Sequence, residues 1–447
     1  MNVLIVESPS KAKSINKYLG NNYKVLASVG HVRDLTAKND AIDTENNFQM
    51  KWETSDRGKK VIKDIANAAQ NSENLYLATD PDREGEAIAW HIEELLREMP
   101  KLANLNIHRI TFNEITKNAV LEALKEPRKV NENLVNAYLA RRALDFLVGF
   151  NLSPVLWRKL PGSKSAGRVQ SVALKIITER EFEIEKFNSE EYWSLKAIFN
   201  KGQEKKFESR LIKFKDEKIE KLTIKTESEA SNFLEKIQNS TYKVKEIQKK
   251  ETKRNPYAAF TTSSMQIEAS RKLGFSANQT MRTAQKLYEG IEINGEPTGL
   301  ITYMRTDSVL MSKDAIEEIR GFVSEKLGNE YIPAEPRIYK SKAKNAQEAH
   351  ECIRPTNIRL SPEELKKYLN SDEYKLYEII WQRAVSSQMA SAIIDQVSVD
   401  ITNEQDIIVF RSNGSSIKFP GMLAVYQETK EEDKKEDDYD KSSLLPP

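Results

Sequence analysis

The chain has 447 residues, of which 39% are hydrophobic and 30% charged, with a formal net charge of +2 at pH 7. This length accommodates about two to four domains. No apolar run approaches the roughly 18 residues that a membrane-spanning helix needs, so a membrane protein is excluded. The single cysteine, Cys352, excludes a disulfide or a cysteine-based zinc site within the chain and fits a reducing, cytoplasmic setting.

Charge is distributed unevenly along the chain. Residues 141–175 contain seven basic residues and one acidic residue, Asp145. A cluster of this kind favours a polyanion as the partner. Residues 429–447 are instead rich in charges of both signs and low in complexity, and we expect this tail to be disordered.

The first 130 residues alternate between strand-like and helix-like segments. This alternation predicts an α/β domain with a mostly parallel sheet. A polar stretch, 36–56, is predicted to be irregular. Predicted strands cover 2–6, 23–29, 75–78 and 106–111, and predicted helices cover 11–19, 59–69, a segment from 84 onward, and 116–124.

The rest of the chain changes character several times. Long helices are predicted over 131–150 and 168–187, with a new short segment at Ser153-Pro154 and a flexible loop at 161–167 between them. Short strands with lysine-rich turns are expected over 190–250, helices over 256–325 and 361–390, and strands over 394–426. The two β-rich stretches flank the helical one, which indicates one β-rich domain interrupted by another domain.

Acidic residues gather where a predicted strand gives way to a helix. Asp80, Asp82 and Glu84 follow the strand 75–78, and Glu7 follows the first strand. Ligands collect at the carboxyl ends of parallel strands, and carboxylate oxygens suit Mg²⁺. The alternative is that Asp82 and Glu84 only complement the N-terminus of the helix. The spacing alone leaves both interpretations open.

Lys11, Tyr303 and Arg305 are further candidates for a site that acts on a phosphate. Lys11 would balance charge near a phosphate, or lie on a solvated helix face. Tyr303 lies in an apolar run, 299–303, predicted as strand-like, so that Arg305 projects from the same face if the strand continues. A phenol is a poor nucleophile at neutral pH unless a cation stabilises its anion or the transition state. The alternative for Tyr303 is an ordinary packed tyrosine.

Two other polar segments are candidates for phosphate contacts. His350, with Arg354 behind it, would hold a phosphate oxygen or relay a proton, or be an ordinary surface histidine. In the small-residue run 165–171, Arg168 and the loop amides would hold a phosphodiester. The sequence has no G-x-x-x-x-G-K-[ST], so no P-loop nucleotide site is expected.

Seven segments together resemble the bacterial type IA DNA topoisomerases. Four look like the Toprim domain of that family and three like its strand-passage core, in order along the chain. The match extends to about residue 426. The segments are Val6–Lys13, Gly30–Leu35, Ala78–Glu86, Phe112–Thr116, Ser165–Ser171, Gly299–Ser308 and Ala349–Thr356.

The resemblance implies an ATP-independent, Mg²⁺-dependent enzyme that relaxes negatively supercoiled DNA. Tyr303 would attack a phosphodiester in one strand and retain the 5′-phosphate, with Arg305 stabilising the transition state. Lys11, Arg168 and His350 match residues near the scissile phosphate. The residues implied to be catalytic are Tyr303, Arg305, Glu7, Lys11 and His350. Those implied to hold Mg²⁺ are Glu7, Asp80, Asp82 and Glu84. Those expected to bind DNA are Arg141, Arg142, Lys164, Arg168 and Gln170.

The implied fold is multidomain, α/β and α+β, closing into a torus. Its parts are a Toprim domain, a partial helical DNA-binding domain, a partial β-rich arch, a domain with the catalytic tyrosine, and the charged tail. The corresponding ranges are 1–130, 131–187, 188–255 with 390–428, 256–389, and 429–447. The family's core continues beyond the residue that matches Pro447, so we expect a core incomplete at its C-terminus that relaxes plasmid slowly by itself. A cytoplasmic monomer associated with the nucleoid is expected.

Other functions remain open at this point. A topoisomerase III-like decatenase shares many of these motifs. Another Toprim enzyme, a nuclease or primase, would keep the acidic cluster and not need Tyr303. A nucleic-acid-binding protein would use the basic run alone and show no metal-dependent cleavage.

Overall fold

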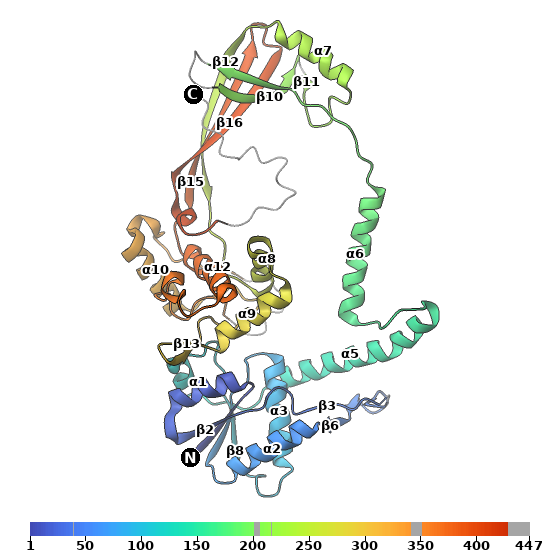
Figure 1. Cartoon of the computed structure of the whole chain (residues 1–447), viewed down its shortest axis with the longest axis vertical. Coiled ribbons are helices and arrows are strands. Elements are labelled where there is room, and N and C mark those ends of the chain that lie inside the picture. Colours follow the sequence, from blue (N-terminus) through green and yellow to red (C-terminus); the bar gives the residue numbers. More distant parts are fainter. Residues whose placement is uncertain (39, 201–205, 216, 341–350, 428–447) are drawn as a thin grey trace. The chain divides into compact units, whose positions relative to one another are not determined.

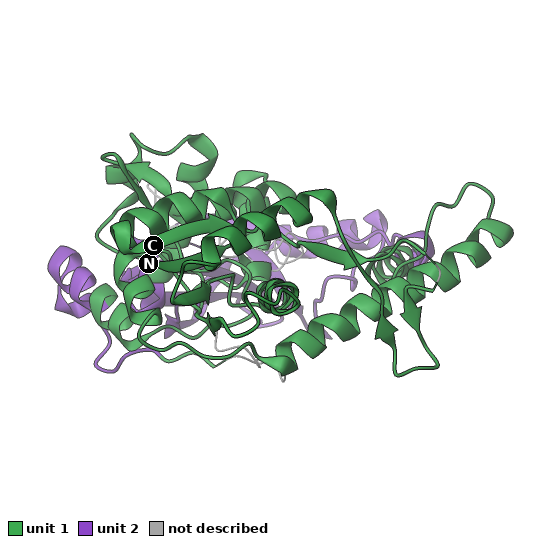
Figure 2. Ribbon diagram, turned by 90° about the horizontal axis from the view of Figure 1, so that it is seen from below, with its two compact units in different colours: residues 1–181, 258–319, 338–384 green, residues 182–257, 320–337, 385–447 purple. Residues whose placement is uncertain are grey.

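The structure is a computed structural model that describes all residues except 39, 201–205, 216, 341–350 and 428–447. The chain divides into two compact units (Figure 2). Unit 1 comprises 1–181, 258–319 and 338–384, and unit 2 comprises 182–257, 320–337 and 385–447. His350 and the predicted tail lie outside the described residues.

Unit 1 contains a four-stranded parallel sheet in the order β2-β1-β7-β8. All four predicted strands are present, although three of them end earlier than predicted. The parallel arrangement was also predicted and is confirmed. The bounds are β1 (Asn2–Val6), β2 (Tyr23–Ala27), β7 (Asn74–Leu77) and β8 (Asn106–Arg109).

Helices cover both faces of this sheet, as parallel strands require. Alternate residues of β1 enter two different apolar cores: Leu4 and Val6 enter one, and Val3 and Ile5 the other. The first core continues into the helices that follow residue 258, and therefore binds the sheet to the tyrosine-bearing part of the same unit. The covering helices are α1 (Pro9–Leu19), α2 (Asp56–Ala69), α3 (Arg83–Arg97) and α4 (Lys117–Ala123).

Two local predictions in this region were wrong. The first helix begins earlier than predicted, because the Ser8 hydroxyl accepts a hydrogen bond from the Lys11 amide and Pro9 occupies the first turn. The stretch 36–56 is not wholly irregular, since short antiparallel pairs form between β3 and β6 and between β4 and β5. Their bounds are β3 (Arg33–Leu35), β4 (Ile42–Asp43), β5 (Gln49–Met50) and β6 (Trp52–Thr54).

The next helix, α5 (Glu132–Lys159), runs without a break through Pro154, where the sequence predicted a new segment. The neighbouring Ser153 is buried, and its hydroxyl accepts a hydrogen bond from the Ala166 amide at 3.1 Å. This contact from the following loop holds the turn that contains the proline. Helix α6 (Arg168–Lys186) follows as predicted.

Many apolar side chains of α6 are exposed, including Val169, Leu174 and Ile177 at 67%, 64% and 66%. Tertiary packing usually supplies most of a helix's stability, and α6 has no buried residue among those described. Despite this apolar surface, no described helix combines the length and hydropathy that crossing a bilayer requires.

The rest of unit 1 is mainly helical (Figure 1). The run 299–303 was predicted as a strand and is not one: only Ile301 forms an isolated bridge, with Pro355. A short hairpin of β13 and β14, which the sequence did not predict, precedes it. Helices α10 and α12 contribute residues to both units. The bounds are α8 (Thr262–Leu273), α9 (Ala277–Glu289), β13 (Ile291–Ile293), β14 (Glu296–Thr298), α10 (Lys313–Leu327), α11 (Pro362–Leu365) and α12 (Ser371–Ser387).

Unit 2 is built on a six-stranded sheet in the order β11-β10-β16-β15-β12, with β9 also paired to β10. The two β-rich stretches of the sequence therefore share one sheet. Within 190–250, β10 and β12 are longer than the short strands predicted there, and α7 was missed. The bounds are β9 (Lys196–Asn200), β10 (Lys206–Phe214), β11 (Glu217–Lys218), α7 (Glu227–Gln238), β12 (Tyr242–Arg254), β15 (Ala392–Asn403) and β16 (Ile408–Phe419).

The two units group the chain more coarsely than the predicted domains, whose boundaries stay a prediction. Residues 131–181, predicted as most of a separate helical domain, group with unit 1, and 320–337, predicted within the tyrosine domain, group with unit 2. Spatial grouping depends on contacts between distant segments, which composition along the chain does not report.

A buried ionic cluster lies at the carboxyl ends of β7 and β8 in the unit 1 sheet. Arg109, at the end of β8, is fully buried and donates from Nε to Glu86 at 3.0 Å. Its remaining nitrogens donate to backbone carbonyls, including those of Thr79 and Asp80 at 2.8 and 2.7 Å. Glu86 also accepts from Arg128. Burial by itself would raise the pKa of Glu86, but the two arginines lower it.

We predict that Glu86→Gln lowers the free energy of unfolding of unit 1 by about 3–5 kcal/mol, because it leaves the buried Arg109 guanidinium without its carboxylate. Native-state hydrogen exchange of the β7 and β8 amides measures this. Glu93→Gln, which disrupts the more exposed pair with Arg97, serves as the control and is expected to cost less than about 1 kcal/mol. Equal costs for the two variants would contradict a structural role for the cluster.

Candidate active site

The pairing of β1 with β7 brings two predicted site residues together. Glu7 directly follows β1, and Asp80 lies three residues beyond the end of β7. The Lys11 ammonium donates to Glu7 Oε2 at 2.9 Å and to Asp80 Oδ1 at 2.5 Å. The Asp80 amide donates to Glu7 Oε1 at 2.9 Å. Lys11 is only 1% exposed, so it does not lie on a solvated helix face, which was one of its two possible positions.

The loop that carries Asp80 is held from several sides. A Cβ atom on Gly85 would lie 2.1 Å from the Asp80 carbonyl oxygen, so only glycine permits this close approach. The Thr79 hydroxyl donates to the Gly85 carbonyl at 2.6 Å, and Arg109 donates to the Asp80 carbonyl from below. The backbone position of Asp80 is therefore fixed.

Asp82 combines a helix cap with a contact to the predicted nucleophile. Its Oδ1 accepts from the Gly85 amide at 2.8 Å as the N-cap of α3, and its Oδ2 accepts from the Tyr303 hydroxyl at 2.6 Å. The capping interpretation of the sequence is thus correct for one oxygen. The second oxygen faces the tyrosine, which lies 221 residues further along the chain.

Tyr303 is held by backbone contacts outside any strand. Its amide donates to the Asn113 carbonyl at 2.8 Å, and the preceding Thr302 amide donates to the Arg354 carbonyl at 2.9 Å. The residue is only 2% exposed. Arg305 follows with a half-exposed side chain whose Nη1 donates to Glu84 Oε2 at 3.2 Å. The structure therefore brings Tyr303, Arg305 and all four predicted acidic residues to one site, even though the strand expected to align Tyr303 and Arg305 does not form.

Burial dominates the electrostatics of this site. It raises the pKa of Asp80 to about 7, even though Lys11 acts in the opposite direction. Burial would also raise the pKa of Glu7, but Lys11 holds it below its usual value. Burial and the charges of Asp80 and Asp82 raise the pKa of Tyr303 far above that of a free phenol. Tyr303 is therefore fully protonated at neutral pH in this arrangement.

The acidic side chains are not gathered around a common point. Within the described part of the chain, no group of three or more His, Cys, Asp or Glu side chains is arranged to hold a metal ion. Each acidic side chain instead contacts a cation or a hydroxyl group. Lys11 lies against Glu7 and Asp80, Tyr303 against Asp82, and Arg305 against Glu84.

Helix α9 forms the far wall of a 560 Å³ cleft that contains these residues. Tyr288 on this helix is fully buried and donates to Asp80 Oδ1 at 3.1 Å. Its ring lies 5.1 Å from the Lys11 ammonium and 5.3 Å from the Tyr303 ring. Sequence reasoning did not identify Tyr288 or Arg109, because one tyrosine or arginine among many carries no local signal of a distant contact. The α9 residues that line the cleft are Asn278, Met281, Arg282, Gln285, Lys286 and Glu289.

A histidine pair lies behind Glu84. His31 Nε2 is 3.7 Å from Glu84 Oε1, and its ring stacks on Tyr138 of α5 at 5.3 Å. His91, fully buried, accepts a hydrogen bond from Arg33. Burial and the neighbouring Arg33 charge lower the pKa of His91 to about 2, so this histidine is neutral.

The residues predicted to bind DNA make separate contacts on α5, on α6 and in the loop between them. Arg142 donates to both oxygens of Asp34, and Arg168 donates to Asp145 Oδ1 at 2.8 Å. Arg141 lies 3.8 Å from Asp145. The Gln170 side chain donates to Ser165, and the Lys164 carbonyl accepts from Trp157 at 2.5 Å.

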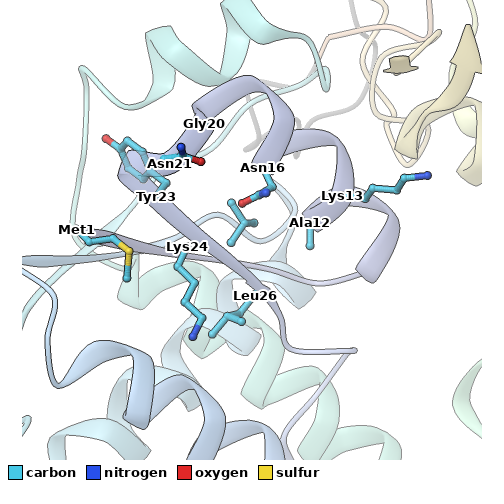
Figure 3. A pocket seen from close by; sticks show the side chains of 10 residues that line it. Met1, Ala12, Lys13, Asn16, Gly20, Asn21, Tyr23, Lys24 and Leu26 are labelled. Carbon is cyan, nitrogen blue, oxygen red and sulfur yellow. The ribbon is translucent and has the colours of Figure 1, made fainter. Parts of the chain in front are cut away.

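A second hollow in unit 1 has no part in this site. It has a volume of 470 Å³ and lies beside α1 and β2 (Figure 3). The residues that line it include Lys13, Asn16 and Lys24 but none of the predicted catalytic or metal-binding residues. The acidic cleft is therefore the better candidate for an active site.

Comparisons with known proteins agree with this geometry. A family model described as "DNA topoisomerase" matches residues 129–445, and one described as "Toprim domain" matches 2–115. The chain belongs to the DNA topoisomerase family and carries a Toprim domain. This confirms the resemblance and the fold class predicted from the sequence.

Individual relatives give the same result. The chain is 51% identical over 448 residues to DNA topoisomerase 1 of Rickettsia bellii and 49% identical over 450 residues to that of Xylella fastidiosa. These alignments cover 100% and 99% of this chain, and 56% and 55% of the relatives. The chain thus spans a little over half the length of these relatives. The structure of full-length topoisomerase I from Thermotoga maritima matches with a TM-score of 0.81 and 38% identity, covering 96% of this chain and 68% of that one.

We predict that Lys11→Met lowers the free energy of unfolding of unit 1 by about 3–5 kcal/mol, because two buried carboxylates then lose their shared cation. Hydrogen exchange of the β1 and β7 amides reports the change. Lys13→Met on the same helix is the control, since Lys13 is 67% exposed and lies 3.7 Å from Glu292; it is expected to cost less than about 1 kcal/mol. A Lys11→Met protein as stable as the control would show that the carboxylates do not depend on this ammonium.

Proposed function

We propose that this chain provides the cleavage and religation centre of a type IA DNA topoisomerase. The observation that supports the proposal most strongly is the Tyr303 hydroxyl held 2.6 Å from Asp82, in a cleft that also contains Glu7, Asp80 and Arg305. This arrangement joins a nucleophile, a carboxylate that receives its proton, and a cation. The proposed activity is ATP-independent relaxation of negatively supercoiled DNA.

In the proposed cleavage step, the Tyr303 oxygen attacks a phosphodiester phosphorus in one DNA strand. A bond forms between the tyrosine oxygen and phosphorus, and the bond from phosphorus to the 3′-oxygen breaks. The phenolic proton passes to Asp82, and the leaving 3′-oxygen takes up a proton from water to become a free hydroxyl. Because the phosphotyrosine ester retains the energy of the broken bond, the reverse attack religates the strand without ATP.

Arg305 stabilises the charge that develops during this step. Its guanidinium is half exposed and reaches the same cleft, and a guanidinium matches the geometry of phosphate oxygens. The Lys11 ammonium keeps Glu7 ionised and fixes both Glu7 and Asp80 near the reacting phosphate. We also infer, from the resemblance alone, that His350 contributes near that phosphate.

We infer that the cofactor is Mg²⁺, held by oxygens of Glu7, Asp80, Asp82 and Glu84. Hard carboxylate oxygens are the donors that this ion prefers, so the donor set fits. The bound ion would neutralise phosphate charge and align the DNA ends for religation. Movement of Tyr303 away from Asp82 toward DNA would free one of these oxygens.

The partner is DNA, as single-stranded segments and negatively supercoiled duplex, contacted by Arg141, Arg142, Lys164, Arg168 and Gln170. We propose a cytoplasmic monomer, with residues 1–130 as the Toprim domain, 131–187 as a helical DNA-binding domain, 188–255 with 390–428 as a β-rich arch, and 256–389 as the tyrosine domain. A nuclease or primase has no use for a tyrosine placed against the acidic residues, so these alternatives are less well supported.

We predict that Tyr303→Phe abolishes the covalent protein–DNA adduct and leaves single-strand affinity nearly unchanged, because only the attacking oxygen is removed. Denaturing gels of labelled oligonucleotide trapped with protein measure the adduct. Tyr368→Phe is the control, because its hydroxyl contacts Asn294 and it does not line the acidic cleft. Adduct formation by the Tyr303→Phe protein would show that another residue is the nucleophile.

We predict that Asp82→Asn weakens Mg²⁺ binding at least tenfold without lowering stability by more than about 0.5 kcal/mol, since asparagine caps helices as well as aspartate. Isothermal titration calorimetry measures the first quantity and thermal unfolding the second. This substitution separates the two roles of Asp82, because Asp82→Ala would remove both. If Asp82→Asn left the Mg²⁺ affinity unchanged, Asp82 would not be a metal ligand, and only its roles as helix cap and proton acceptor would remain.

A further inference from the structure

Unit 2 contains a cleft of 410 Å³ that no part of the proposed mechanism uses. It lies against β10 and β16, with the turn after β11 as a wall. Four of the residues that line it are cationic and one is acidic. The cations are Arg210, Lys218, Lys221 and Arg411, and the acid is Glu220, which lies 3.2 Å from the Lys218 ammonium.

Two of the cations are direct neighbours across the sheet. Arg210 and Arg411 are register partners in the antiparallel pair of β10 and β16, so their side chains leave the same face. Two guanidinium groups that leave the same face of a sheet can contact one phosphate together.

Arg411 is also held in a fixed orientation. Its Nε and Nη2 donate to the two oxygens of Asp400 at 2.7 and 2.8 Å, and the Asp400 side chain is only 14% exposed. This two-point contact sets the plane of the guanidinium, while 38% of the Arg411 side chain stays accessible. A guanidinium fixed in this way loses little freedom when it binds a phosphate.

An aromatic ring completes the site. Tyr192 lines the cleft, is 40% exposed, and lies 5.0 Å from the Lys221 ammonium. Cations beside an accessible aromatic ring are the combination that binds single-stranded nucleic acid, since phosphates pair with the cations and a base stacks on the ring. A simple anion would have no use for the ring.

We infer that this cleft binds one nucleotide unit of single-stranded DNA, with its phosphate on the arginines and lysines and its base on Tyr192. The identity of the polyanion rests on the proposed function. The site itself belongs to unit 2 and is distinct from the acidic cleft and from the basic run on α5 and α6. It gives the β-rich unit a DNA contact of its own.

The test measures binding of oligo(dT) by fluorescence anisotropy at several salt concentrations, with every protein in the Tyr303→Phe background. Lys218→Gln with Lys221→Gln is compared with Lys60→Gln with Lys63→Gln, exposed lysines on α2 that give the same change in net charge. The salt slope for single strands changes by about 0.7 per phosphate contact. We expect the cleft variant to lose about 0.7 to 1.4 from this slope and the control to lose none. Tyr192→Leu should weaken binding about tenfold with the slope unchanged.

Three results would overturn the inference: equal slopes for the cleft and control variants, full affinity of Tyr192→Leu, or weakening of hairpin duplex binding but not of oligo(dT) binding. The assay involves no cleavage, so its outcome is independent of whether Tyr303 forms an adduct. If Tyr303 formed no covalent adduct but the unit 2 cleft still bound oligo(dT), the proposed function would be refuted and the inference about the cleft would hold.

Discussion

One buried ammonium supports the chemistry of this molecule. The Lys11 side chain extends from the first helix to the ends of two neighbouring parallel strands and contacts a carboxylate from each. Without a cation, two buried carboxylates this close repel each other and one takes up a proton. Burial, with a smaller contribution from the Glu7 charge, raises the pKa of Asp80 to about 7 even with Lys11 present. The acidic cleft therefore depends on the pairing of β1 with β7 and on the charge that this pairing encloses.

The site combines two kinds of support. From below, Arg109 and Gly85 fix the backbone around Asp80. From above, Tyr303 and Tyr288 reach the same carboxylates from the helical part of unit 1. The lower support comes from the end of β8 and the first turn of α3. The upper contacts are single hydrogen bonds from side chains, which suits the proposed exchange of a carboxylate for a phosphate by Tyr303.

Local sequence signals predicted the parallel sheet and the acidic strand ends because these depend on hydrophobic alternation and on topology. These signals did not decide where the Lys11 side chain lies. A lysine on a helix gives the same sequence pattern whether its side chain faces water or two carboxylates. They gave a strand at 299–303, where hydrogen bonds from distant segments to Thr302 and Tyr303 impose a different backbone. Arg109, Tyr288 and the cleft of unit 2 depend entirely on contacts between residues far apart in the chain. The continuation of α5 through Pro154 was missed for the same reason, because the contact from the loop at Ala166 is not a local signal.

The central claim is that Tyr303 forms a covalent bond to a 5′-phosphate. The most direct test is to trap the adduct, digest it with trypsin and fragment the peptide Leu287–Arg305, which contains both Tyr288 and Tyr303. The account predicts a nucleotide on Tyr303, joined through its 5′-phosphate. A nucleotide on Tyr288, on any other residue, or joined through a 3′-phosphate would contradict it.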